Sequence, residues 1–350
     1  MRRKKRISTA FVLALMLVLT ACGGADDDAE PAADTADDAA DDTADDTADD
    51  TADDSDAPAG EGGMIAIITV DPSNPYWAAE VDTAVAEAEA LGYETTVNAH
   101  NNDADQQNQF IDGAISAGAV AIILDPAGAE ESVGAVQKAT DAGIPVFLVN
   151  AEIAEQGIAK SQLVSNNAQG ATLGAQEWAD AMGGEGTYVE LLGNPTDNNA
   201  RVRSDAYAEV LSQFPDLELL QQETANWDRV QGKERMDTLL SAHPDLDGVV
   251  SGNDEMALGA IESLREAGRL DEVLVLGFDG NQDAVDAVKA GEMVATVLQP
   301  IVEVTKRAVQ QADNYLRTGE TGVDSEKQAI DCVLITPENA DQFENFVMVG

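Results

Sequence analysis

The stretch GVVSGNDEMALGAIESLREAG, residues 248–268, carries the pattern that decides the fold. It begins with a short β-branched run at 248–250, which is typical of a buried strand. Asn253 then stands where a helix N-cap is expected, and residues 256–267 carry apolar side chains at spacings of three and four. The stretch therefore predicts a strand that is followed directly by an amphipathic helix.

The same order, a strand and then a helix, recurs along the chain from residue 64 onward. The other expected strands are 65–70, 95–98, 120–124, 146–149, 187–191, 217–222, 273–277 and 295–298. Further expected helices include 76–91, 106–117, 173–181 and 230–240. Alternation of this kind predicts parallel sheets covered by helices on both faces. Because a single sheet of so many strands would be large, we expect two α/β lobes.

The composition is strongly acidic. The chain of 350 residues has 19 Lys and Arg against 66 Asp and Glu, a formal net charge of −47. This excludes a basic nucleic-acid-binding surface, since neutralising phosphates needs clustered cations. Two Cys cannot supply a disulfide framework. The acidic body at 62–350 favours solubility, and either adaptation to high salt or an ordinary compositional bias would account for it.

The first 61 residues have the composition of an export signal and a tether. Five cations at 1–6 precede an apolar run at 7–21 that is too short for a comfortable membrane span. The sequence LTACG at 19–23 resembles the lipobox of bacterial lipoproteins, which implies a signal peptide at 1–22 and lipidation of Cys22. A lone Cys at the end of a signal anchor is the alternative. Residues 23–61, with a repeated TADD motif, are expected to form a disordered acidic tether.

Polar and aromatic residues stand just past the ends of the expected strands. In open parallel sheets, ligands bind beyond the carboxyl ends of the strands. Amides and carboxylates can pair with adjacent hydroxyls, and aromatic faces can cover the C–H side of a sugar. The pattern favours a neutral polyhydroxylated ligand, although each amide taken singly could simply cap a helix. The residues in these positions are Asn74, Tyr76, Trp77, Asp125, Asn150, Asn253, Phe278, Asp279 and Gln299.

Several motifs between residues 64 and 336 resemble, in order, the ribose-binding family of periplasmic binding proteins. They are NPYW at 74–77, AGIPV at 142–146, ANWDR at 225–229, NDEMALGA at 253–260, GFDG at 277–280 and ATVLQ at 295–299. NDEMALGA is a highly specific element. The resemblance implies two doubly wound parallel-sheet lobes joined by three hinge crossovers. Such lobes close on one sugar, which is then delivered to an ABC importer in the membrane.

The resemblance also assigns roles and adds residues to the candidate site. It implies that Arg203 grips sugar oxygens from the second lobe and that Trp227 stacks on the sugar. Asn150 and Ala151 stand where ribose binders carry Asp-Arg, and Asp125 stands where they carry Asn. Since each unsatisfied hydrogen-bonding group costs about 1–3 kcal/mol, these departures argue against ribose itself. Another monosaccharide or polyol is expected, and volume alone does not separate a small polyol from a hexose or a cyclitol.

The same mapping predicts the lobes and the biological setting. Crossovers are expected near 165–166, after 299 and near 331–332, so that the lobes comprise 62–165 plus 300–331 and 166–299 plus 332–350. The expected protein is a monomeric lipoprotein without a cofactor, held outside the cytoplasm by its lipid anchor and serving an ABC permease. Presentation of the bound sugar to a chemoreceptor or a sensor kinase is the alternative output.

Other functions have weaker support in the sequence. Repressors of the lactose-repressor type share the two-lobed fold but begin with a DNA-binding helix-turn-helix, where this chain has the export signal. Asp125 and Asp279 could form an acid–base pair as in glycosidases, but both stand where the family binds hydroxyls. No enzymatic activity is therefore expected. His100 and His243 lie far apart in the sequence, so no metal site is expected. Cys332, in an apolar run, is expected to be packed.

Overall fold

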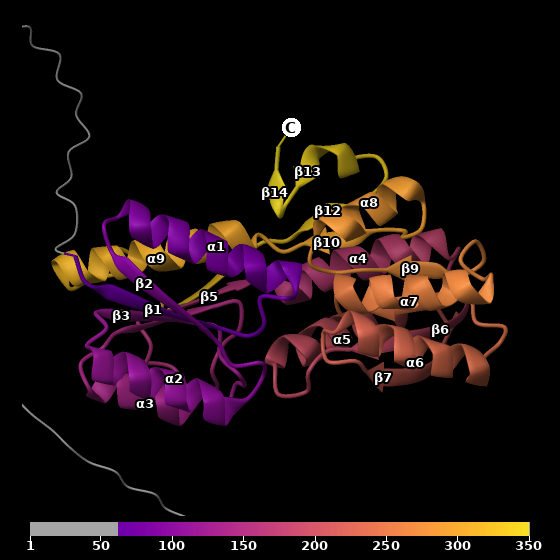
Figure 1. Ribbon diagram of the computed structural model, residues 1–350. Helices are drawn as coiled ribbons and strands as arrows, with labels where there is room; N and C mark the ends of the chain where they lie inside the picture. Colours follow the sequence, from indigo (N-terminus) through magenta and orange to yellow (C-terminus); the bar gives the residue numbers. More distant parts are fainter. Residues whose placement is uncertain (1–61, 350) are drawn as a thin grey trace, which may run out of the picture. The chain divides into compact units, whose positions relative to one another are not determined.

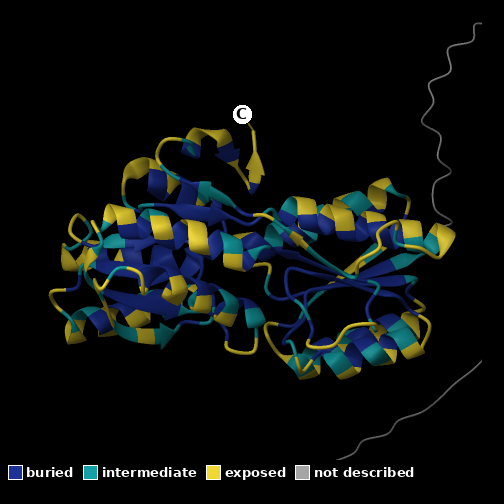
Figure 2. Ribbon diagram, turned by 180° about the vertical axis from the view of Figure 1, so that it is seen from behind, coloured by how far each residue is buried: buried dark blue, intermediate teal, exposed yellow. Residues whose placement is uncertain are grey.

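The computed structural model describes residues 62–349 of the chain. The predicted signal peptide, Cys22 and the acidic tether at 23–61 lie outside the described residues. From residue 64 onward, strands and helices alternate along the chain, as the sequence pattern predicts (Figure 1). Figure 2 shows buried strands between helices that turn exposed faces outward, so each sheet is covered on both sides.

The larger sheet has six parallel strands in the order β11-β5-β4-β3-β1-β2. Alternate residues of its β1 strand enter two different hydrophobic clusters, Ile65 and Ile67 in one, Ala66 and Ile68 in the other. Both faces of this sheet therefore need helices over them. The strands are β1 (Met64–Thr69), β2 (Glu94–Ala99), β3 (Ala121–Leu124), β4 (Val146–Val149), β5 (Ser161–Ser165) and β11 (Lys327–Ile330).

Two pairs of helices cover this sheet and complete what we term the first lobe. Helices α1 (Pro75–Ala90) and α9 (Ile301–Thr318) pack side by side on one face, and α2 (Ala104–Ala117) and α3 (Val133–Asp141) cover the other (Figure 1). Helix α9 comes from late in the chain. The first lobe is thus built from two separate stretches of sequence.

The second lobe is built around a four-stranded parallel sheet in the order β7-β6-β8-β9. Helices α4 and α5 share one hydrophobic cluster with this sheet, and α6 and α7 lie against its other face. The strands are β6 (Glu185–Leu192), β7 (Asp216–Thr224), β8 (Gly248–Ser251) and β9 (Leu274–Leu276). The helices are α4 (Asn167–Ala181), α5 (Asn198–Leu211), α6 (Arg229–Ala242), α7 (Asp254–Ala267) and α8 (Gln282–Ala290).

The chain passes between the two lobes three times. It leaves the first lobe between β5 and α4, returns between β10 (Thr296–Leu298) and α9, and crosses again between β11 and β12 (Val333–Ile335). The first and third crossings are joined by Asn166, whose Nδ2 donates to Oδ1 of Asp331 at 2.8 Å. After β12 the chain forms a short helix, η1 (Ala340–Gln342), and a hairpin of β13 (Phe343–Glu344) and β14 (Val347–Met348).

The α/β prediction with two parallel sheets is confirmed, with two corrections in detail. Every expected strand is present, but β10 pairs with β12 in the antiparallel direction. Strands β5 and β11 of the larger sheet and the hairpin strands β13 and β14 were not expected, and the sequence of β5, SQLVS, has Ser and Gln at positions that the fold buries. Gln162 in β5 satisfies its side-chain amide through the backbone of Ile153 and Glu155 and through Glu326. Within residues 62–349, no helix has both the length and the apolar character needed to cross a bilayer.

Helices α6 and α7 approach each other so closely that glycine is required at their contact. A Cβ at Gly259 would lie 2.1 Å from the carbonyl oxygen of Arg229 and 2.7 Å from the backbone nitrogen of Lys233. Neither atom can move without displacing helix α6. By contrast, a Cβ at Gly113 on α2 would meet no heavy atom within 4 Å.

We therefore predict opposite effects for two Gly→Ala substitutions inside helices. Gly259→Ala should lower the free energy of unfolding by about 1–3 kcal/mol, because the methyl group forces the two helices apart. Gly113→Ala should leave it unchanged or raise it by about 0.5–1 kcal/mol, because alanine is the better helix former. Urea denaturation of the ligand-free protein measures both values. Equal effects of the two substitutions would contradict this account of the α6–α7 contact.

Candidate functional site

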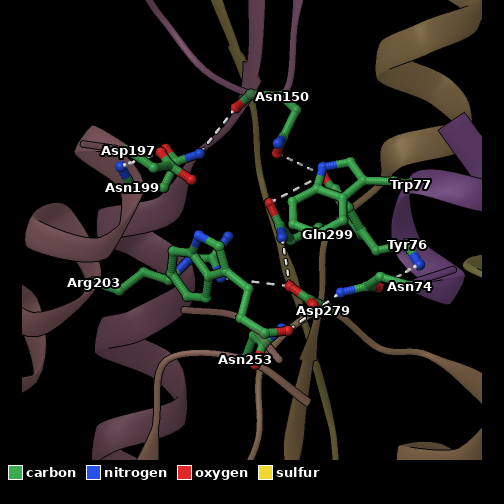
Figure 3. A pocket seen from close by; sticks show the side chains of 11 residues that line it. Asn74, Tyr76, Trp77, Asn150, Asp197, Asn199, Arg203, Asn253, Asp279 and Gln299 are labelled. Carbon is green, nitrogen blue, oxygen red and sulfur yellow. Dashed lines mark hydrogen bonds and ion pairs between the residues drawn. The ribbon is translucent and has the colours of Figure 1, made fainter. Parts of the chain in front are cut away.

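A cavity lies at the carboxyl ends of strands from both lobes, with an empty volume of about 260 Å³. Figure 3 shows side chains from the start of α1 on one side and from the start of α5 on the other. Most of the lining residues are those predicted from the sequence, and Asp197 and Asn199 are additional. The complete lining is Asn74, Tyr76, Trp77, Asn150, Asp197, Asn199, Arg203, Trp227, Asn253, Asp279 and Gln299.

Two of the lining asparagines also cap helices, so the capping and binding interpretations both apply. Oδ1 of Asn74 accepts a hydrogen bond from the backbone of Tyr76 at 2.9 Å, at the start of α1. Oδ1 of Asn253 accepts from the backbone of Met256 at 2.9 Å, at the start of α7. Because the cap occupies each oxygen, the amide nitrogen is the group left to face the cavity. Both residues are therefore oriented as hydrogen-bond donors.

The two amide nitrogens meet the same backbone atom, the carbonyl oxygen of Trp227. Nδ2 of Asn253 donates to it at 3.3 Å within the second lobe, and Nδ2 of Asn74 donates to it at 3.5 Å from the first lobe. Trp227 has a φ of +66° and follows Asn226 at +54°, a left-handed backbone that is unfavourable for a bulky side chain. This backbone turns the carbonyl toward the first lobe. The strained turn thus provides a contact between the lobes at the edge of the cavity.

The indole of Trp227 lies in a slot formed by two glycines. A Cβ at Gly193 would lie 2.0 Å from the Cζ2 atom of the indole, and one at Gly252 would lie 3.1 Å from its Cζ3 atom. Any side chain at Gly193 would displace the ring. The sequence analysis assigned Trp227 a stacking role, and the slot explains how the ring is kept in place as a wall of the cavity.

Arg203 is fixed by contacts on every side. Its guanidinium donates through Nε to Asn167 at 2.7 Å and through Nη1 to the carbonyl of Gly252 at 2.7 Å, and Nη1 lies 3.4 Å from Oδ1 of Asp279. The guanidinium carbon lies 4.0 Å from the ring centroid of Phe278. Phe278, expected at the ligand, therefore lies behind Arg203 instead of lining the cavity.

Asp279 and Gln299 form a polar edge next to Arg203. Nε2 of Gln299 donates to Oδ1 of Asp279 at 2.7 Å, and both side chains are buried. Burial raises the pKa of Asp279 to about 8, and Arg203 opposes this shift. A carboxyl group, a guanidinium and an amide side by side can both donate to and accept from neighbouring hydroxyl groups. The edge suits a neutral ligand with several hydroxyls.

Asp125, also expected at the ligand, lies behind the lining and orients two residues that belong to it. Its Oδ2 accepts from Nε1 of Trp77 at 2.9 Å and from Nδ2 of Asn150 at 2.8 Å. The Asp125 side chain is 1% exposed. Asp125 thus places an acceptor where two donors converge. Direct contact between Asp125 and the ligand stays a prediction.

A second buried carboxyl group, Glu80 on α1, lies beside Asp125. Its Oε1 accepts from Oγ1 of Thr69 at 2.8 Å, and the residue is 1% exposed. Burial raises the pKa of Glu80 to about 7, and burial together with the nearby Glu80 carboxyl raises that of Asp125. The sequence analysis missed Glu80. The available signal was its helical spacing of three and four from Trp77 and Tyr76.

Asp197 and Asn199 were also missed. Asp197 caps α5 by accepting from the backbone of Asn199 at 2.9 Å, and Nδ2 of Asn199 donates across the lobes to the carbonyl of Asn150 at 3.2 Å. The segment between β6 and α5 is the same strand-to-helix junction that identified the other residues. A search of the residues that follow Leu191, the last residue of the expected strand, would have found them.

The residues expected to be inert are placed as follows. Cys332 is 4% exposed, and burial raises the pKa of its thiol to about 12, which confirms the packed thiol. His100 contacts the carbonyl of Asp125, whereas His243 contacts Gln221 in the second lobe. Among the described residues, no group of three or more His, Cys, Asp and Glu side chains is arranged to hold a metal ion.

Comparison with known proteins assigns the family. The family model described as a periplasmic binding protein domain matches residues 65–321. The chain belongs to the periplasmic binding protein family. A D-apiose import binding protein of Paraburkholderia graminis is 49% identical over 81% of this chain and 91% of its own length. A ribose import binding protein of Bacillus subtilis is 32% identical over 70% of this chain and 78% of its own.

A solved structure supports the same assignment. An ABC transporter solute-binding protein from Bacillus halodurans with bound myo-inositol is 28% identical, with a TM-score of 0.76 over 83% of this chain and all of its own. The family and fold expected from the motifs are therefore confirmed. Proteins of this family are binding proteins.

We predict that Gly193→Ala weakens ligand binding about tenfold or more, because the methyl group displaces the Trp227 indole from its slot. Gly134→Ala on α3, where a Cβ would meet nothing within 4 Å, should leave the affinity unchanged. Adding Trp227→Phe to Gly193→Ala should restore part of the affinity, since a smaller ring fits beside the methyl group. Isothermal titration measures the three dissociation constants. An unchanged affinity for Gly193→Ala would show that the slot does not position the ring.

We predict that the free energy of unfolding falls as the pH rises from 5 to 8, partly through Glu80. Its pKa of about 7 in the folded protein exceeds its ordinary value, so the folded state holds a proton that the unfolded chain releases. This stabilisation is complete below the ordinary pKa and is lost as the pH passes 7. Glu80→Gln keeps an acceptor for Thr69 and cannot ionise, so the fall should be smaller.

The control for this experiment is Glu218→Gln, which removes an exposed carboxylate on β7. Urea denaturation at pH 5 and pH 8 gives the change in unfolding free energy for each variant. If Glu80→Gln and Glu218→Gln show the same pH dependence as the wild type, the buried proton is not on Glu80.

Proposed function

We propose that the protein is the solute-binding component of an ABC importer and captures a neutral monosaccharide or polyol between its two lobes. The observation that carries this proposal is the composition of the cavity wall, to which both lobes contribute. Asn74 and Asn253 present amide donors, Arg203 and Asp279 present a guanidinium and a carboxyl group, and Trp227 presents a flat apolar face. These groups match the hydroxyls and the C–H face of a sugar.

The ligand that we propose is D-apiose, a branched pentose, or a sugar of similar size. The relative from Paraburkholderia graminis that covers most of the chain is named for D-apiose. Asn150 and Ala151, in place of the Asp-Arg of ribose binders, argue against ribose.

Closure of the lobes on the ligand is the proposed mechanism. We take the moving bodies to be residues 62–165 plus 300–331 and 166–299 plus 332–350. Asn74 reaches the carbonyl of Trp227, Asn199 reaches that of Asn150, and the backbone of Ala129 donates to that of Thr196 at 3.2 Å. A ligand that touches both bodies favours the closed state through contacts that the open state lacks.

The setting outside the cytoplasm follows from the family and from the N-terminal sequence. We propose that Cys22 carries a lipid anchor and that residues 23–61 tether a monomeric body to the cell membrane, where it meets the permease. The names of the relatives refer to import, which favours transport over presentation to a chemoreceptor or sensor kinase.

Binding without catalysis is also part of the proposal. An acid–base pair of Asp125 and Asp279 would need both carboxyl groups at the ligand. Asp125 does not line the cavity, and its Oδ2 accepts hydrogen bonds from Trp77 and Asn150. Asp279 is bonded to Gln299 and paired with Arg203. Asp279 is therefore the one of these two carboxyl groups that lines the cavity, and its contacts with Gln299 and Arg203 suit binding of hydroxyls.

A thermal-shift screen of the full chain tests the proposal with D-apiose, D-ribose, D-allose, xylitol and myo-inositol. All compounds are used at one common concentration; a ligand for which this is 100 times the dissociation constant adds about 2.7 kcal/mol to the unfolding free energy, and a weaker ligand adds less. We expect the largest shift with D-apiose. A larger shift with ribose would contradict the interpretation of Asn150 and Ala151. If no neutral polyhydroxylated compound shifts the melting temperature, the assignment to sugars is wrong.

A further inference from the structure

The C-terminal hairpin contains a turn whose residues are unusual for its geometry. Strands β13 and β14 pair Glu344 with Val347, which leaves Asn345 and Phe346 as a two-residue loop. Both have positive φ values, +47° for Asn345 and +67° for Phe346. This is the pattern of a type I′ turn, in which the second position strongly favours glycine. Phenylalanine at that position is unfavourable for the turn itself.

The side chain of Phe346 does not point into solvent, although it lies at the tip of a hairpin. Phe346 is 6% exposed, and its ring packs edge-to-face on Tyr76, with centroids 5.8 Å apart and planes at 81°. Phe346 and Tyr76 belong to one hydrophobic cluster. In contrast, Met348 on the same hairpin is 54% exposed. The unfavourable turn thus places one aromatic ring in a defined contact.

The hairpin is attached to the second lobe, whereas Tyr76 belongs to the first. The backbone of Asn345 donates to Oε1 of Gln282 on α8 at 3.3 Å, and Asp341 lies 3.6 Å from Nζ of Lys289 on the same helix. In Figure 1 the hairpin lies above the space between α1 and α8. The contact between Phe346 and Tyr76 therefore spans the two lobes.

Tyr76 connects this contact to the cavity, although Phe346 itself does not line it. The Tyr76 hydroxyl donates to Oδ1 of Asn150 at 3.0 Å and lies 3.3 Å from Oε1 of Gln299, and all three residues line the cavity. Opening of the lobes would separate α1 from the hairpin and expose both rings. Phe346 thus packs on a residue of the cavity wall without lining the cavity itself.

We propose that Phe346 is a positioning residue that clasps Tyr76 when the lobes close, so that the C-terminal hairpin slows release of the ligand. This proposal rests on the proposed function, because it requires lobes that close on a ligand. The slower release would come from the edge-to-face contact across the lobes and from the burial of both rings. Phe346 therefore needs no contact with the ligand.

The substitution Phe346→Gly removes the ring that contacts Tyr76 but keeps the hairpin. It creates an Asn-Gly turn, which suits the type I′ geometry, so the hairpin itself should be retained. In stopped-flow measurements with D-apiose on the full chain, we expect the dissociation rate to rise about two- to tenfold, with the association rate unchanged. Met348→Ala, an exposed change on the same hairpin, should leave both rates unchanged. Circular dichroism confirms that each variant is folded.

Small-angle scattering of the ligand-free proteins provides a second measurement that needs no ligand. If the clasp favours closure, Phe346→Gly should have a larger radius of gyration than the wild type and Met348→Ala. Equal dissociation rates for the wild type and Phe346→Gly would overturn the proposal. If the wild type does not bind D-apiose, the assigned ligand is wrong, and the scattering comparison alone decides: a larger radius for Phe346→Gly supports the clasp, and equal radii overturn it.

Discussion

The carboxyl ends of two parallel sheets supply one shared cavity, and the binding site depends on this constraint. In a parallel sheet every strand ends at the same edge and the next helix begins there, so the loops between them gather helix N-termini. Asn74 and Asn253 follow β1 and β8 in this way. Each uses its oxygen to cap a helix and keeps its nitrogen for the cavity. Fold and hydrogen-bonding capacity therefore arise from the same junctions.

Buried residues that do not touch the cavity determine how its walls are held. Asp125 receives hydrogen bonds from Trp77 and Asn150, and Gly193 leaves the space that the Trp227 indole fills. Arg203, which does line the cavity, is held from behind by backbone and side-chain acceptors before any ligand arrives. Groups fixed in this manner lose little conformational freedom when a ligand binds, which favours affinity and selectivity.

Local sequence pattern predicted most of the site, because the strand-to-helix junctions can be recognised from a short stretch. Phe278 and Asp125 were assigned to the ligand and lie one layer behind the lining. Glu80 and Phe346 were missed because their importance comes from residues distant in the sequence, Asp125 and Tyr76. Strand β5 was missed because it buries Ser161, Gln162 and Ser165, and only the tertiary contacts of Gln162 show how one of these polar side chains is accommodated. The local sequence pattern therefore predicts the strand-to-helix junctions, whereas tertiary contacts decide which side chain at each junction faces the cavity.

A crystal structure of the protein with D-apiose tests the central claim most directly, namely that both lobes bind one sugar in this cavity. The account predicts a single sugar enclosed by the lobes, with the Trp227 indole against its C–H face and Asn74 and Asn253 donating to its hydroxyls. A sugar bound to one lobe alone would contradict it. So would a sugar in the outer groove lined by Asp71, Asn102 and Gln231.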